Sequence, residues 1–182
     1  DTIFSIGGVL LAALLLVLGL VLQSQASFAQ TYVRDQLAQQ KITFTPVDKL
    51  TDEEKKSDCL VQNAGQALTT GAQAECYANA YIGLHVSEVN DGKTYSQTST
   101  ESRAAQAKAD AAVKASAPDA EQLQAQAKAL AAKTDTLFKG ETLRGLLLTS
   151  YGFSIFGERA QQAAYVAYAA ALVLFLASIA GF

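Results

Sequence analysis

The stretch TIFSIGGVLLAALLLVLGLVL, from Thr2 to Leu22, decides the fold because it contains no charged residue. About twenty such residues are enough to cross the hydrocarbon core of a bilayer as a helix. A second apolar run extends from Ala163 to Phe182, after a border marked by Glu158 and Arg159. The sequence therefore predicts two membrane spans, with a water-exposed segment between them and both ends on the same side of the membrane.

These runs predict an all-α membrane protein in which two transmembrane helices flank an extracytoplasmic helical domain. A signal peptide is the competing interpretation of the first run, because SQA at residues 24–26 resembles a cleavage site. The apolar core of the run is longer than the roughly 7 to 15 residues of a typical signal peptide, which favours a span. We expect transmembrane helix 1 over residues 2–22, the extracytoplasmic domain with an N-terminal helical stalk over 23–140, a short interfacial helix over 141–159 and transmembrane helix 2 over 160–182.

The charges lie almost entirely between the two apolar runs. This segment holds all 14 basic residues and every acidic residue except Asp1, and the net charge of the chain is −3. Such a balance leaves no basic face that would indicate binding to nucleic acid or anionic lipid. Neither span carries a charge at its centre, where an ionisable group would mark an ion or proton path, so we expect neither a pump nor a channel.

The two cysteines, Cys59 and Cys76, indicate the orientation of the chain. Basic residues cannot indicate it, since connecting loops longer than about 60 residues escape the positive-inside rule. An isolated cysteine pair in a membrane-anchored domain fits a disulfide formed on the oxidising, extracytoplasmic side. Two free thiols in a cytosolic domain are the alternative. We therefore predict a multi-pass protein of the cell membrane, with both termini cytoplasmic and the central domain extracytoplasmic.

The predicted disulfide also tests the helices around it. If Cys59 faces Cys76 across a helical hairpin, the first helix ends near Gly65 and QALTTG, residues 66–71, forms the turn, because a bridge needs Cα atoms within about 7 Å. If both helices are instead long and turn at Gly71, the cysteines are out of register and remain unbonded.

Turn and capping signals predict the other boundaries inside the domain. Alternating polarity and a proline predict an extended connector or a lone edge strand over residues 41–47. Two T-x-x-E capping boxes, Thr51–Glu54 and Thr98–Glu101, predict helix starts. The expected helix ends are the NDG sequence at 90–92, the Ser, Pro and Asp residues within 116–119, and the Lys139–Gly140 pair.

No arrangement of residues predicts an enzyme. The single histidine, His85, is expected on a helix whose apolar face holds Ala74, Tyr77, Tyr81 and Leu84. The sequence offers it no second histidine, no carboxylate at metal spacing and no nucleophile-elbow serine. The glycines form no GxxxxGK phosphate loop and the cysteines form no CxxC zinc motif. We expect no catalytic residue, no cofactor and no metal site.

The second span is the better candidate for docking onto another membrane helix. Its alanines stand in small-x-x-x-small relations, which let helix backbones approach closely in lipid, whereas the first span is mostly Leu and Val. The apolar segment before it is too short to span and is bounded by charges, which is typical of a helix at the membrane surface or against a partner. A buried core helix is the alternative for that segment. The predicted partner contacts are Glu141, Leu143, Arg144, Ala160, Ala163, Ala164, Ala167 and Ala171.

Two stretches, ECYANAYIGLHVSEVNDGKTYS (75–96) and LFKGETLRGLLLTSYGFSIFGERA (137–160), resemble a family of small actinobacterial two-span membrane proteins, often mislabelled ring-opening dioxygenases. This family is similar to the accessory factor associated with the cytochrome bcc and cytochrome oxidase supercomplex of the electron transport chain. The resemblance implies a helical extracytoplasmic domain at the periphery of a respiratory assembly, without assigned catalytic residues. The dioxygenase label finds no support, because such an enzyme needs several His and carboxylate ligands and this chain has one His.

We therefore expect a non-catalytic accessory or assembly subunit of a membrane complex, in the first place the actinobacterial respiratory supercomplex. Its partners would be integral membrane subunits, the cytochrome bcc and cytochrome oxidase subunits among them, and the lipid bilayer. The alternative is an extracytoplasmic sensor or ligand-binding module of a truncated membrane receptor, because two spans flanking a helical domain also describe chemoreceptor input regions. A sensor needs a cytoplasmic output domain, so the length of the full gene distinguishes the two.

Overall fold

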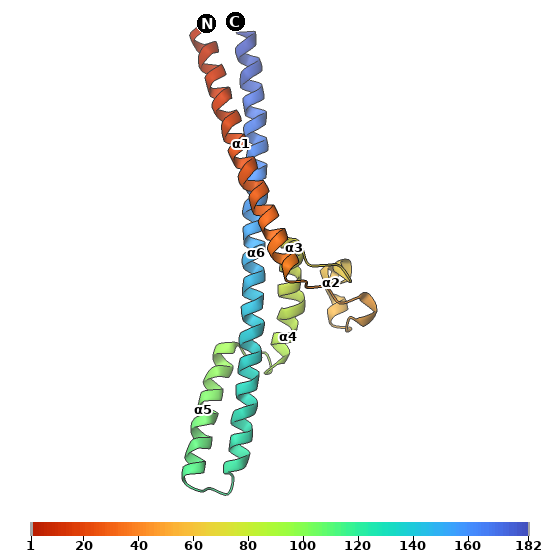
Figure 1. The fold of residues 1–182 in the computed structure, drawn as a ribbon, viewed down its shortest axis with the longest axis vertical. Helices are drawn as coiled ribbons and strands as arrows, with labels where there is room; N and C mark the ends of the chain where they lie inside the picture. The colour runs from red at the N-terminus through yellow and green to blue at the C-terminus, as the bar shows by residue number, and fades with distance from the viewer. Residues whose placement is uncertain (1, 182) are drawn as a thin grey trace. The chain divides into compact units, whose positions relative to one another are not determined.

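The computed structural model describes residues 2–181 and is all-α, with two long apolar helices flanking a central helical region (Figure 1). Within these residues the only β pairing is a single bridge between Thr43 and Ala67, in the connector expected over 41–47. The helical elements are α1 (Thr2–Gln39), η1 (Val47–Lys49), η2 (Glu54–Lys56), α2 (Asp58–Asn63), α3 (Gly71–Cys76), η3 (Tyr77–Ile82), α4 (Gly83–Glu88), α5 (Tyr95–Lys114) and α6 (Ala120–Ala180).

The chain divides into two compact units. Among the described residues, unit 1 contains 2–42, 68–71 and 150–181, and unit 2 contains 43–67 and 72–149. The long helix α6 therefore contributes to both units. By length and composition, α1 and α6 are each candidates to cross a membrane.

Helix α1 continues without a break beyond the first apolar run, which confirms the expected helical stalk, and reaches Gln39. One face of it is made of small residues at every seventh position, which are buried: Ser5, Ala12, Gly19 and Ala26. Residues seven apart lie on the same side of a helix, two turns from each other. This face of α1 is therefore shaped for close approach by another helix.

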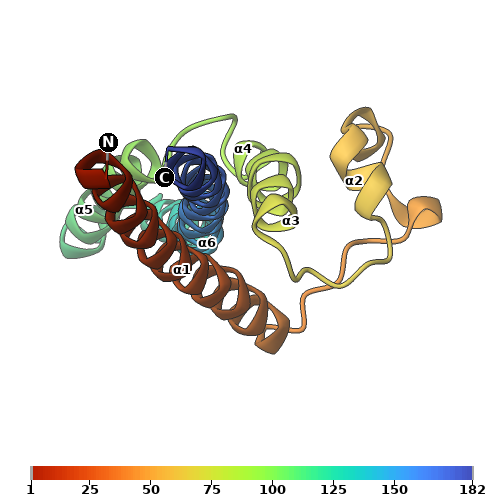
Figure 2. The same cartoon turned by 90° about the horizontal axis from the view of Figure 1, so that it is seen from above.

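The partner of this face is the last part of α6, which carries its own small residues seven apart and buried: Gly157, Ala164, Ala171 and Ser178. A Cβ atom added to Gly157 would lie 2.9 Å from the Ala29 Cβ, and one on Gly19 would overlap the Tyr168 ring. The first turn of α1 and the last turn of α6 lie side by side (Figures 1 and 2). Unit 1 is thus built on an antiparallel helix pair whose two ends leave on the same side.

In unit 2, the capping box predicted at Thr51–Glu54 is present, but the helix that follows is shorter than expected. The Thr51 N–H donates to Glu54 Oε2 at 2.7 Å, and the Glu54 N–H donates to Thr51 Oγ1 at 3.2 Å. The turn that they start is the 3₁₀ segment η2. It ends where Ser57 takes an extended conformation, and α2 begins at the next residue.

The helix predicted to start from the Thr98–Glu101 box begins earlier, at Tyr95 of α5. Its cap is Thr94, whose Oγ1 accepts from the Gln97 N–H at 3.3 Å while the Gln97 side chain accepts from the Thr94 N–H at 2.9 Å. Two consecutive boxes of the same chemistry therefore compete, and the first one caps the helix. The hydroxyl of Thr98 is used elsewhere, because this residue is fully buried inside unit 2.

The expected breaks at 90–92 and 116–119 are confirmed. Asp91, Gly92 and Ser116 have φ values of 53°, 75° and 51°, in the left-handed region that ends a helix. The third expected helix end, at Lys139–Gly140, is wrong, because α6 runs unbroken through it.

For the same reason the segment 141–159 is not a separate short helix but the middle of α6. The glycine that indicated a helix end has a packing role instead. A Cβ added to Gly140 would overlap Cγ1 of Val86, so this position lets α4 pack closely on α6.

Candidate functional site

The disulfide predicted between Cys59 and Cys76 is present in unit 2, where it joins α2 to α3 with the Cα atoms 6.0 Å apart. Helix α2 ends before Gly65, whose φ of 72° is one that glycine adopts without strain. The structure therefore has the short hairpin with its turn over 66–71. The alternative of two long helices that turn at Gly71, with free cysteines, is excluded.

Behind the disulfide, α3, η3 and α4 form one helical run from Gly71 to Glu88, and its middle segment η3 is a π-helix. A π-helix has i→i+5 hydrogen bonds, is rare in proteins and frequently occurs at functional sites. Its wider turns change which residues face inward. The expected face included Tyr77 and Tyr81, which are only half-buried and whose rings stack with centroids 4.7 Å apart. The buried residues of the run include Ala74, which was expected, and also Ala78, Ile82 and Val86.

The π-helix faces α6 at Arg144, where the two stretches that carry the family resemblance meet. Arg144 Nη2 donates to Asn79 Oδ1 at 3.2 Å, and Nη1 donates to Glu141 Oε2 at 3.4 Å. The Nε atom of Arg144 lies 3.8 Å from where a Cβ on Gly83 would be, and it is buried without a hydrogen-bond partner among the described residues. The structure thus brings two predicted contact residues, Glu141 and Arg144, to one site.

A pocket of about 290 Å³ opens beside Arg144, and its lining includes Asn79, Ser87, Lys93 and Glu141. Lys93 is already paired with a carboxylate at 2.8 Å. Both hydrogen bonds of Arg144 are longer than the roughly 2.7–2.9 Å of strong charge-assisted bonds. Arg144 is therefore the cation of this pocket that can bind a further acceptor, such as a carboxylate or a backbone carbonyl.

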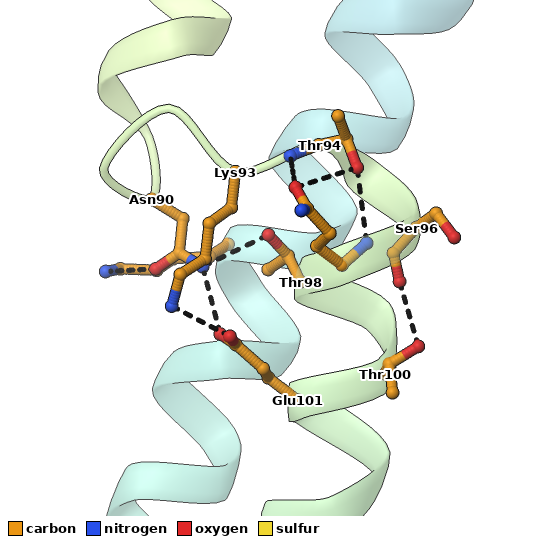
Figure 3. Close-up of polar contacts among 9 residues, drawn as sticks. Asn90, Lys93, Thr94, Ser96, Thr98, Thr100 and Glu101 are labelled. Carbon is orange, nitrogen blue, oxygen red and sulfur yellow. Dashed lines mark hydrogen bonds and ion pairs between the residues drawn. The ribbon is translucent and has the colours of Figure 1, made fainter.

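The wall of the pocket that carries Lys93 is fixed by a polar cluster around the buried Asn90 (Figure 3). Asn90 Nδ2 donates to Thr98 Oγ1 at 3.1 Å, and Asn90 Oδ1 accepts from Lys133 Nζ at 3.0 Å. Glu101 completes the cluster through its ion pair with Lys93 at 2.8 Å. The hydrogen bond in this pair lowers the pKa of Glu101 and raises the pKa of Lys93. The cluster ties the turn after α4 to both α5 and α6.

His85 lies apart from this cluster and pairs with the buried Glu54, with Nε2 3.6 Å from Oε1. Its Nδ1 is 2.7 Å from the Tyr81 carbonyl oxygen. Hydrogen bonds from the Thr51 backbone and side chain, and then the nearby His85, lower the pKa of Glu54. These contacts hold the His85 ring between the Glu54 carboxylate and the Tyr81 carbonyl. Within residues 2–181, no group of three or more His, Cys, Asp or Glu side chains is placed to hold a metal ion.

The alanines predicted as partner contacts fall on different faces of α6. Ala164, Ala167 and Ala171 are buried, and the first and last of these belong to the face packed on α1. A neighbouring subunit therefore cannot use that face while the helix pair is intact. Ala160 is half-buried and Ala163 is exposed, so these two remain accessible, and Leu143 is exposed in unit 2.

Two features of these sites were missed by reasoning from the sequence. The small-residue face of α1 was overlooked because its Leu and Val content dominates, although the repeat at positions 5, 12, 19 and 26 was readable. The contact of Asn79 and Gly83 with Arg144 had no local signal, because it joins residues more than sixty positions apart.

No protein-family model, no curated protein and no solved structure matches this chain.

Proposed function

We propose that the protein is a non-catalytic accessory or assembly subunit of a membrane protein complex, with α1 and the last part of α6 as its transmembrane helices. The antiparallel packing of these helices through small residues carries the proposal. It uses the close-packing face of each helix and leaves large apolar side chains exposed on the rest of both surfaces. Such surfaces are stable in lipid or against apolar protein, not in water. Exposed residues of this kind include Leu14, Val17, Leu172 and Val173.

The disulfide supports an extracytoplasmic position for unit 2. Disulfides form and persist in oxidising compartments and are rare in the cytosol. Because both ends of the helix pair leave on the same side, the two termini are then cytoplasmic. This is the orientation expected from the sequence.

The complex that we propose is the actinobacterial respiratory supercomplex of cytochrome bcc and cytochrome oxidase. This choice rests on the likeness of residues 75–96 and 137–160 to the family of its accessory factor. The two stretches pack on each other, with Asn79 and Gly83 against Arg144 and with Val86 against Gly140. These contacts join the two stretches within unit 2, which supports a shared role in contacting a partner subunit.

Purification in mild detergent through a tagged oxidase or bcc subunit tests the proposal. We expect this protein to co-purify, and its absence from both preparations would overturn the proposed function. We also expect Arg144→Glu to weaken co-purification, because it reverses the charge of the cation with spare hydrogen-bonding capacity. Lys128→Glu makes the same change of charge at an exposed position of α6 away from the pocket and is the matched control.

A further inference from the structure

Four exposed aromatic side chains lie in unit 1, on the stalk part of α1 and on α6, and three of them are in ring contact. Phe28 stacks on Tyr32 with ring centroids 5.7 Å apart, and Tyr32 meets Phe153 edge-on at 5.9 Å. Phe156 lies one turn further along α6, on the side of Phe153. The exposed fractions are 58% for Phe28, 50% for Tyr32, 38% for Phe153 and 74% for Phe156. We call these four residues the aromatic patch.

The aromatic patch lies outside the bilayer if the two helices span it, so this inference rests on the proposed function. The apolar runs end at Leu22 on α1 and begin at Ala163 on α6. An α-helix rises 1.5 Å per residue, which places the patch about 9 to 15 Å beyond these two residues. The headgroup layer on one side of a bilayer is only about 5 to 8 Å thick. The patch is therefore farther out than an interfacial aromatic belt.

Charges next to the aromatic patch oppose a deeper position. Glu158 and Arg159 lie between Phe156 and the second apolar run, and both are exposed. If the helix pair moved far enough to place the patch among the headgroups, these charges would enter the edge of the hydrocarbon, which is unfavourable. Lipid chains consequently do not cover the patch.

We propose that the aromatic patch docks against an apolar, extracytoplasmic surface of a neighbouring membrane subunit, just above the bilayer. A buried aromatic side chain covers about 150–250 Å², so the exposed fractions leave roughly 300–550 Å² of the patch open. This area is about half of the roughly 800 Å² that each partner contributes to a standard interface. It is also within the size range of the largest apolar patch on a typical monomer, about 300–600 Å², which is often functional.

The border of the aromatic patch indicates how the partner is oriented. Within residues 2–181, neither Glu158 nor Arg159 forms an ion pair, and Arg159 donates only to Gln162, at 3.2 Å. An aromatic centre with a charged border is the usual arrangement of an interface whose energy is concentrated in a few side chains. The partner surface is therefore apolar opposite the rings, with charges complementary to Glu158 and Arg159 on its membrane side.

A single-tryptophan experiment tests this proposal, because the chain contains no tryptophan of its own. Phe156→Trp puts the reporter in the aromatic patch, and Val173→Trp puts a matched reporter on the exposed face of the second span. In nanodiscs that hold the protein alone, we expect aqueous iodide, and not acyl-chain-brominated lipid, to quench the reporter at 156. The reporter at 173 should show the reverse. In the co-purified complex, whose other subunits can contain tryptophan, the signal of the reporter is the difference between complexes with the Phe156→Trp protein and with the wild-type protein. Iodide quenching of this difference signal should be lost.

The outcomes distinguish a failure of docking through the aromatic patch from a failure of the proposed function. Quenching at 156 by brominated lipid would overturn docking, since lipid would then cover the patch. Protection from iodide in the isolated protein, together with a dimeric mass, would overturn it in favour of a second copy of the chain. Iodide quenching that persists in a complex still containing the protein would overturn docking and leave the proposed function intact. Failure of the wild-type protein to co-purify would instead overturn the proposed function.

Discussion

Removal of the disulfide should destabilise unit 2 by about 3 kcal/mol. The bond between Cys59 and Cys76 closes a loop with a sequence separation of 17. Closing a loop of this length removes roughly 3 kcal/mol of conformational entropy from the unfolded chain. The perturbation is the double variant Cys59→Ser, Cys76→Ser. Because Cys76 is buried, a serine there adds a hydroxyl in an apolar site, so reduction of the wild-type protein provides a second comparison without that change.

Hydrogen–deuterium exchange read by mass spectrometry is a suitable assay, because it reports each part of the chain separately. A loss of about 3 kcal/mol corresponds to roughly 100-fold faster exchange of amides that exchange through opening of unit 2. We expect this acceleration in peptides from α2 and α3, both in the variant and in the reduced protein. Peptides from residues 2–22 are the internal control and should not change.

Unchanged exchange of α2 and α3 in both preparations would refute this reasoning. It would mean that the hairpin holds its conformation without the bond, so that closing the loop contributes little to stability. Acceleration in the serine variant alone would attribute the effect to the buried hydroxyl rather than to chain entropy.

Three further predictions concern single residues. Gly140→Ala should destabilise unit 2 by about 1–3 kcal/mol in thermal unfolding, because the new Cβ overlaps Val86. The control is Gly145→Ala, because no atom lies within 4 Å of the new Cβ, and it should stabilise unit 2 by up to about 1 kcal/mol. If both variants changed the stability equally, the proposed packing role of Gly140 would be contradicted. The pKa of Glu54 is lowered in the folded protein, chiefly by the hydrogen bond from the Thr51 backbone N–H. The stabilisation that the Glu54 carboxylate contributes should therefore be complete above pH 4.5, the ordinary pKa of this group. It should be lost as the pH falls through the lower pKa of Glu54 in the folded protein. Glu54→Gln should therefore differ most from wild type at neutral pH, and a stability difference that does not narrow in acid would exclude this carboxylate as the cause. Asn90→Ala should cost about 1–3 kcal/mol in denaturant unfolding, since it leaves the buried Thr98 hydroxyl without its donor, and an unchanged midpoint would show that water replaces the amide.

The features that could be predicted from the sequence are those determined by neighbouring residues. The two apolar runs, the left-handed turns at Asp91 and Ser116 and the Thr51–Glu54 box each have their cause within a few positions. Predicting the hairpin around the disulfide needed one further step: a bond between Cys59 and Cys76 requires the chain to reverse near their midpoint. The same condition correctly placed the end of α2 near Gly65.

The features that could not be predicted depend on contacts between distant residues. Gly140 indicates a helix end when it is considered alone, and only Val86 on another helix shows that the glycine makes room for close packing. Thr94 and Thr98 offer equal capping chemistry, and the contact of Thr98 with Asn90 decides between them. The Arg144 site is the clearest case, because Asn79 and Arg144 are 65 positions apart, with the Ala-rich helix α5 between them in the sequence.

The helix pair of unit 1 also sets an order for biogenesis in the proposed topology. It joins Gly8 to Ser178 and Gly19 to Tyr168, so each contact waits for the last turns of α6 to leave the ribosome. In that topology α1 would until then be a lone helix in the membrane, with lipid against its face of small residues. The disulfide loop can be oxidised on the far side during this interval. The last part of α6 would then displace lipid from this face of α1. We therefore expect the protein to join the proposed complex only after α1 and α6 have packed together as a helical hairpin.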